Sequence, residues 1–152
     1  MATSKSETFL CLSAGLLSQG FGVRFSPKGA SMFPTIKDGE IVTVEPIEPR
    51  HVKRGDIILY KTRKLGSPLI AHRVVSVRRD KRNVTAFILR GDASQSDDAP
   101  IEPGQVLGRV ISVEREGRNI NLTSRRAWLT LTVRRRLSEI KARAYYALEP
   151  EE

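Results

Sequence analysis

The chain has 152 residues, enough for one domain with a substantial hydrophobic core. Apolar residues make up 39% and charged residues 28%, which indicates a globular rather than a disordered protein. The formal net charge is +9, and the single cysteine, Cys11, excludes an internal disulfide. One cysteine and two histidines also argue against a structural zinc site, so we expect no metal or other cofactor.

The N-terminal part, residues 1–20, is predicted to be helical. Its apolar run FLCLSAGLL, residues 9–17, is nine residues long, whereas a membrane-spanning helix needs about twenty. We therefore expect a cytoplasmic or peripheral membrane protein without a transmembrane segment. Ser4 would cap the helix, with Glu7 three residues later, and Phe9, Leu12 and Leu16 would share a face.

Residues 21–122 have the pattern of short strands. Val- and Ile-rich runs alternate with turn residues such as Asp38-Gly39, Gly91-Asp92 and Pro103-Gly104. This spacing predicts a mainly β fold, with a compact barrel or sandwich core. The runs are FGVRF (21–25), IVTVE (41–45), IILYK (57–61), IAHRVVSV (70–77), VTAFILR (84–90), VLGRVISVE (106–114) and NINL (119–122).

A basic amphipathic helix is predicted for the C-terminal part, residues 123–152. Its apolar residues recur every three or four positions, and residues 123–148 contain seven Lys or Arg and one Glu. Such a helix either contacts a membrane surface or a protein partner, or packs on its own core with solvated arginines. Because most of the positive charge lies here and aromatic content is 6%, the β core is not expected to bind nucleic acid.

The segment KGASMFPTIKDGE, residues 28–40, contains a candidate nucleophile, Ser31. By itself the segment is typical of a loop, because Ser, Gly, Pro and Asp form turns. A nucleophilic serine needs a base, and often a third group that orients the base. His51 lies in a predicted exposed loop, whereas His72 lies in an apolar strand that would hold it rigidly. Taken alone, however, a histidine in an apolar strand is usually a hydrogen-bonded core residue.

Carboxylates follow the next strand, in RGDASQSDDAPI, residues 90–101. Asp92, Asp97 or Asp98 could accept the imidazole N–H and stabilise the imidazolium, or could simply cap a turn.

Several segments follow one another in an ordered series: SMFPT, DGEIVTV, VKRGDIILY, HRVV, FILRGDASQSDD and VLGRV. The series resembles the signal-peptidase clan, most closely the endoplasmic-reticulum and archaeal type, in which a Ser-His pair replaces the bacterial Ser-Lys pair. The resemblance covers about residues 22–113. It implies a signal-peptidase-like β fold and a serine endopeptidase that cleaves an extended peptide, such as a leader, bound beside a β-edge.

The resemblance also assigns roles by position. Ser31 corresponds to the nucleophile, His72 to the general base and Asp98 to the orienting acid. Asp92 corresponds to an aspartate that supports the site, and Arg73 is expected to brace its strand through an ion pair.

The neighbour of Asp98 keeps one assignment open. Adjacent strand residues point to opposite sides, so a one-residue shift in register would put Asp97 at the imidazole instead of Asp98. Met32 and Phe33 would anchor the turn after Ser31 in apolar surroundings, and the Ser31 amide would face the developing oxyanion.

Two departures from signal peptidases leave alternatives. Gly29 stands where those enzymes usually have Ser, and GASM matches the GxSM of the self-cleaving SOS repressors, which use a lysine base. Here Lys61 and Lys64 fall at a strand end and in a loop, so His72 is the better candidate. The usual membrane anchor before the nucleophile is not evident in the sequence.

Two further functions stay open as alternatives to an active peptidase. One is a non-catalytic peptide-binding module on the same scaffold. The other is a self-cleaving repressor-like protein, although its Ala14-Gly15 bond lies only 16 residues before Ser31.

Overall fold

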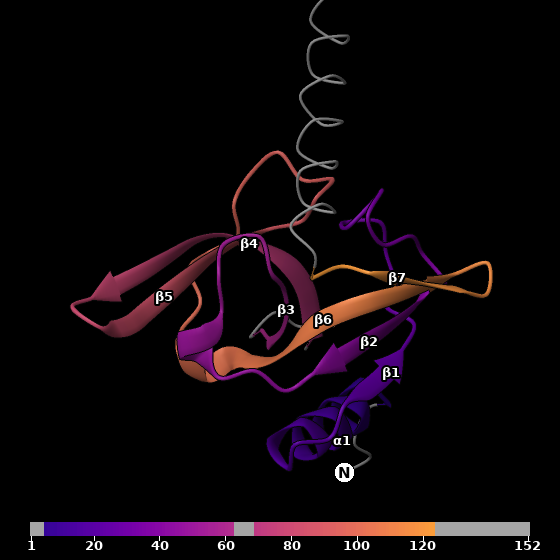
Figure 1. The fold of residues 1–152 in the computed structure, drawn as a ribbon, viewed down its shortest axis with the longest axis horizontal. Coiled ribbons are helices and arrows are strands. Elements are labelled where there is room, and N and C mark those ends of the chain that lie inside the picture. Colours follow the sequence, from indigo (N-terminus) through magenta and orange to yellow (C-terminus); the bar gives the residue numbers. More distant parts are fainter. Residues whose placement is uncertain (1–4, 63–68, 124–152) are drawn as a thin grey trace, which may run out of the picture.

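The computed structural model describes residues 5–62 and 69–123. Within these residues the chain is mainly β, as predicted, with one α-helix (Figure 1). The proposed cap Ser4, the alternative base Lys64 and all but the first residue of the predicted C-terminal helix lie outside them. In chain order the elements are α1 (Lys5–Ser18), β1 (Val23–Phe25), β2 (Ile41–Glu45), the 3-10 helix η1 (Pro49–His51), β3 (Ile57–Lys61), β4 (Leu69–Asp80), β5 (Asn83–Arg90), the 3-10 helix η2 (Pro103–Gln105), β6 (Val106–Arg115) and β7 (Arg118–Asn121).

The seven strands form one antiparallel sheet in the order β1-β2-β6-β3-β4-β5, with β7 paired to β6. Strand β6 therefore lies between β2 and β3, although it comes much later in the sequence. In the described part of the chain the sheet is open, because its edge strands β1 and β5 do not pair with each other. The strand spacing predicts a barrel or sandwich core, but the sheet formed by residues 5–62 and 69–123 does not close into a barrel.

Apolar side chains pack on both faces of the sheet. The strand β3 shows the division, because Ile57 and Leu59 belong to one cluster while Ile58 and Tyr60 belong to the other. The first cluster also contains Leu17 of α1 and Met32. The second cluster is completed by connecting segments, through Val52 and Ile101 among others.

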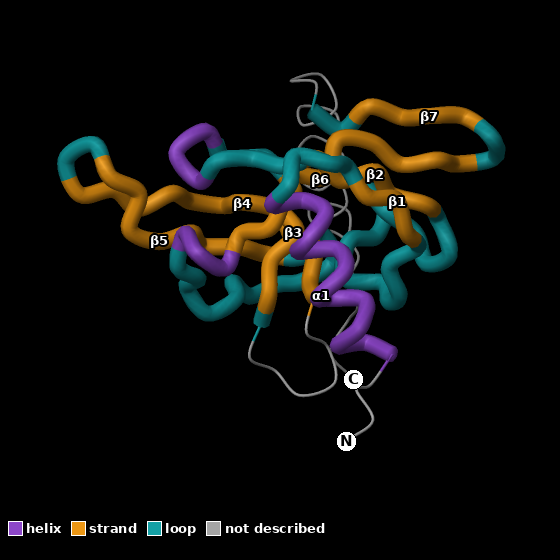
Figure 2. The backbone as a smooth tube through the Cα atoms, turned by 90° about the horizontal axis from the view of Figure 1, so that it is seen from below, coloured by secondary structure: helices purple, strands orange, loops and turns teal. Residues whose placement is uncertain are grey.

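Helix α1 lies along one side of the sheet (Figure 2). Its core contact is Leu17, which is 3% exposed and packs where Gly108 of β6 lacks a side chain. The predicted apolar face of Phe9, Leu12 and Leu16 is 38–62% exposed, so these residues are not the core face of the helix. None of the helices among the described residues has the length and apolarity needed to cross a bilayer.

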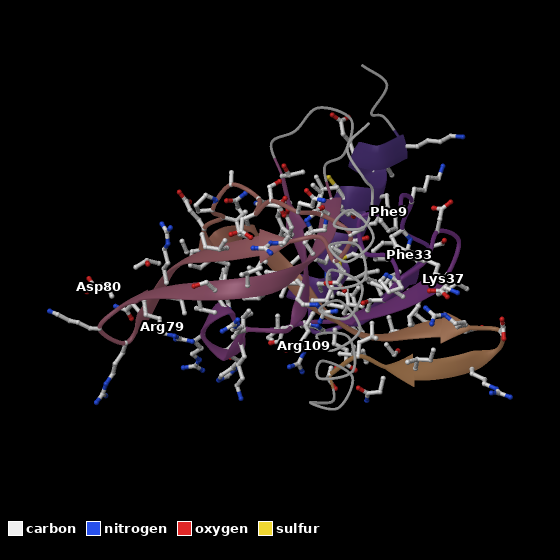
Figure 3. The ribbon with its side chains drawn as sticks, turned by 90° about the horizontal axis from the view of Figure 1, so that it is seen from above. Phe9, Phe33, Lys37, Arg79, Asp80 and Arg109 are labelled. Carbon is white, nitrogen blue, oxygen red and sulfur yellow. The ribbon has the colours of Figure 1, made fainter. Side chains whose placement is uncertain are left out.

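Strands β4 and β5 form a long hairpin that extends away from the rest of the sheet (Figure 1). Arg79 and Asp80 lie at its tip, far from Phe33 in the loop after β1 (Figure 3). The base of this hairpin, and not its tip, is the part that adjoins the Ser31 loop.

Candidate active site

Ser31 lies in the loop between β1 and β2 and is exposed to solvent. Two residues earlier, Gly29 has φ of +101°, a left-handed conformation that favours glycine, and its N–H donates to Asp38 Oδ1 at 2.9 Å. Met32 is 5% exposed and enters the hydrophobic core, as expected. Phe33 is 53% exposed, so only one of the two predicted apolar anchors is buried. The Ser31 side chain is thus presented outward from a loop fixed by Met32.

His72 projects from β4 at the position paired with Ile58 of β3, and it is 7% exposed. Its Nε2 lies 3.0 Å from Ser31 Oγ, and its Nδ1 lies 2.5 Å from Asp98 Oδ2. In the tautomer that satisfies both contacts, Nδ1–H donates to the carboxylate and Nε2 accepts from the hydroxyl. The three side chains are therefore joined in a continuous series of hydrogen-bond contacts.

The two neighbouring aspartates are separated by the fold. Asp98 donates its backbone N–H to Leu89 O of β5 at 2.8 Å, which directs its side chain toward His72. The Asp97 carboxylate instead binds Arg90, with 2.5 Å between Arg90 Nε and Asp97 Oδ1. Asp98 is therefore the carboxylate in contact with the imidazole, and Asp97 is not.

Asp92 and Arg73 join the Ser31 loop to the sheet. Arg73 donates to both carboxylate oxygens of Asp92, at 2.8 and 2.7 Å, and to Gly55 O at 2.8 Å. The hydroxyl of Thr35, four residues after Ser31, also donates to Asp92. Because both charged side chains are at most 15% exposed, this bidentate pair is a well-ordered brace beside the site.

Gly91 is a close neighbour of the site that the sequence pattern marked only as a turn residue. A Cβ at this position would lie 2.6 Å from Ser31 O and 3.1 Å from His72 Nε2. A hydrogen bond two residues later also connects this segment to the Ser31 loop, since Ala93 N–H donates to Ser31 O at 2.9 Å. The segment after β5 can approach the Ser31 loop this closely only because residue 91 has no side chain.

Tyr60 of β3 is a second residue that sequence reasoning missed. Its hydroxyl donates to Asp98 Oδ2 at 3.2 Å, and the residue is 3% exposed. Burial and the Asp98 charge raise the pKa of Tyr60 well above its usual value. The alternation in IILYK could have indicated the face to which Tyr60 points, but not its partner.

The other candidate bases lie in different settings. His51 lies in η1 and is exposed, and Lys61 is exposed at the end of β3. His51 lines a cavity of about 690 Å³ together with residues of α1 and β6, and none of Ser31, His72 and Asp98 lines it. Within residues 5–62 and 69–123 we find no cluster of three His, Cys, Asp or Glu that could hold a metal ion.

Comparison with known proteins does not assign the chain to a family. A scan of the sequence against protein-family models finds no match, and a search among curated proteins finds none either. The functional argument therefore depends on the chemistry of the site itself.

Proposed function

We propose that this protein is a serine endopeptidase that uses Ser31, His72 and Asp98 as nucleophile, general base and orienting acid. The observation that supports it is the unbroken contact from Ser31 Oγ through both ring nitrogens of His72 to Asp98. A buried histidine with only a structural role does not need an exposed hydroxyl group in contact with its Nε2 atom. Here that nitrogen meets an exposed serine, as a nucleophile requires.

The reaction follows from this arrangement. Ser31 Oγ attacks the carbonyl carbon of the scissile bond while His72 Nε2 takes the hydroxyl proton. Asp98 stabilises the resulting imidazolium. The Ser31 amide is the donor that we expect to face the developing oxyanion. His72 then protonates the leaving amine, and a water molecule activated by the same imidazole hydrolyses the acyl-enzyme.

The order of the motifs supports placing the protein in the signal-peptidase clan, with an extended leader-like peptide as substrate. Such a peptide would lie along the exposed Ser31 loop. Self-cleavage at Ala14-Gly15 is disfavoured, because this bond lies within α1 and would first have to be unwound. We therefore favour cleavage of a separate peptide chain.

A serine-reactive fluorophosphonate probe and a quenched-peptide library test the proposal. Wild-type protein should be labelled and should cleave a subset of peptides. Ser31→Ala should abolish labelling, and Ser31→Ala or His72→Ala should each reduce cleavage by at least about 10⁴-fold. Both variants should keep the far-ultraviolet circular dichroism spectrum of the wild type.

The two aspartates provide an internal comparison. Asp98→Asn should lower kcat by about 10³- to 10⁴-fold, because the amide no longer favours the required tautomer. Asp97→Asn should have a small effect, because its exposed pair with Arg90 does not contact the imidazole. Labelling that persists in Ser31→Ala would contradict the proposal. Wild-type protein that binds peptides but cleaves none would indicate the peptide-binding module instead.

A further inference from the structure

The Asp98 carboxylate has a second donor besides His72. The hydroxyl of Tyr60 lies 3.2 Å from Asp98 Oδ2, the same oxygen that lies 2.5 Å from His72 Nδ1. The tyrosine and histidine rings are also neighbours, with centroids 6.4 Å apart and planes inclined at 60°. Two side chains, from β3 and β4, thus converge on one oxygen atom of Asp98, a residue in the segment after β5.

We propose that Tyr60 is a positioning residue, whose hydroxyl holds the Asp98 carboxylate toward His72 and reduces the negative charge that the imidazole experiences. The effect of the Tyr60 hydroxyl on catalysis rests on the proposed peptidase function. Its effect on the protonation of His72 does not rest on that function, because it follows from the hydrogen bonds alone.

The surroundings of Tyr60 suit a permanent donor. The residue is 3% exposed and lies in the hydrophobic cluster with Ile58 and Phe87, so its ring has little freedom to move. Burial and the nearby Asp98 charge raise the pKa of its hydroxyl. The group therefore stays protonated across the pH range in which a histidine titrates, and it donates throughout that range.

A carboxylate held on one side only would behave differently. Without the Tyr60 hydroxyl, the Asp98 side chain would keep His72 as its one hydrogen-bond partner among residues 5–62 and 69–123, and its charge would be less well stabilised. A stronger negative charge at Oδ2 favours the imidazolium, so His72 would hold its proton to higher pH. A base that must be neutral to accept the Ser31 proton would then be active over a narrower range.

Other charged groups near His72 do not supply this effect. On the elements packed against it, three arginines are paired with aspartates rather than with the imidazole. The pairs are Arg73 with Asp92, Arg90 with Asp97, and Arg109 with Asp56, the last at 3.9 Å. Lys61 is exposed at the end of β3, and Arg79 and Asp80 lie at the far tip of the β4–β5 hairpin. Asp98 contacts His72 Nδ1 directly, and the Tyr60 hydroxyl acts on this nitrogen through its hydrogen bond to Asp98.

Tyr60→Phe tests the proposal, because it removes the hydroxyl and keeps the ring. The first measurement is an NMR titration of His72 in a His51→Gln background, where His72 is the one remaining histidine. We expect the titration midpoint to rise by about half a pH unit. With a cleavable peptide, the acidic limb of the pH–rate profile should shift in the same direction, and kcat should fall about tenfold with KM nearly unchanged.

Two comparisons separate positioning from packing. Ile70→Val alters the cross-strand neighbour of Tyr60 without touching a hydroxyl, and it should leave the His72 midpoint in place. In an Asp98→Asn background, Tyr60→Phe should cause no further loss of activity, because the two residues act through one contact. An unchanged midpoint in a folded Tyr60→Phe protein would overturn the proposal, as would an equal loss of rate in the Asp98→Asn background. The NMR titration midpoint of His72 tests the effect of Tyr60 even if the wild-type protein cleaves no peptide.

Discussion

At the scale of single residues, the site depends on close approach between two loops. Gly91 lies where the segment after β5 meets Ser31, and a methyl group there would overlap Ser31 O at 2.6 Å and crowd His72 Nε2 at 3.1 Å. The obstacle on one side is backbone, which cannot move aside as a flexible side chain can. The contact between Ser31 and His72 therefore requires glycine at position 91.

We expect Gly91→Ala to separate Ser31 from His72, because the loop must retreat to make room. Peptide cleavage or probe labelling should fall by about 100-fold or more, and stability should drop by about 1–3 kcal/mol. Gly104→Ala is the matched control, because a Cβ there meets nothing within 4 Å and its φ is not positive. The control should retain wild-type activity and stability. Full activity in Gly91→Ala would contradict the geometry described here.

The sequence could identify the chemical types at this site but not all of their contacts. Ser31 and His72 stand out because a hydroxyl in a tight loop and an imidazole in an apolar strand are recognisable patterns. Asp97 and Asp98 are indistinguishable by pattern, and the Asp98 N–H bond to Leu89 O separates them. Tyr60 could not be predicted as a partner, because a tyrosine in an alternating strand is equally typical of an ordinary core residue.

At the scale of elements, the end of β6 holds the loop that carries Ser31. Arg115 forms a two-point ion pair with Glu40 and donates to Thr35 O at 3.2 Å. The Glu40 side chain is 11% exposed, whereas that of Arg115 is 29% exposed. This pair links the start of β2 and the loop before it to a strand more than seventy residues later.

The Arg115 hydrogen bonds hold the pKa of Glu40 below its usual value. A carboxyl group whose pKa is lower in the folded state than in the unfolded state stabilises the fold at pH values above its unfolded-state pKa, here 4.5. This contribution is lost as the pH falls through the folded-state pKa. We therefore expect Glu40→Gln to lower stability at pH 7 by about 1 kcal/mol, a modest value because Arg115 is partly solvated. The deficit should shrink toward pH 3 in urea unfolding measured at each pH.

Glu48→Gln is the control for this pair. Glu48 lies 2.6 Å from Arg50, but both side chains are at least 60% exposed, so the free energy of unfolding should barely change at either pH. A deficit in Glu40→Gln that stays constant or grows as the pH falls would show that the ion pair is not its cause.

The strand boundaries could be predicted closely, because Val- and Ile-rich alternation between turn residues is a local property. The predicted runs 41–45, 57–61 and 106–114 match β2, β3 and nearly all of β6. The order of strands could not be predicted, because the place of β6 between β2 and β3 is set by which apolar faces fit together over long distances. The residue through which α1 meets the core could not be predicted for the same reason, since Leu17 packs where Gly108 has no side chain.

At the scale of the whole molecule, the three site residues come from parts of the chain that only the complete sheet brings together. Ser31 is attached to the segment after β5 through Ala93, and Asp98 is attached to β5 through Leu89. Both clusters of the core include residues of β3, so the two faces of the sheet share a central strand. The site therefore has no evident means of forming before the sheet does.

We expect the site and the fold to be lost in one step. In urea, labelling of Ser31 by the fluorophosphonate probe and far-ultraviolet circular dichroism should decline together, with one midpoint. Leu17→Ala should move both curves to lower urea by the same amount, equivalent to about 2–4 kcal/mol, because Leu17 is buried against β6. Leu12→Ala should move neither curve, because Leu12 is 62% exposed.

Labelling that disappears well before the circular dichroism signal would mean that the Ser31 loop unfolds separately from the sheet. The brace formed by Arg73, Asp92 and Thr35 would then be weaker than its geometry indicates.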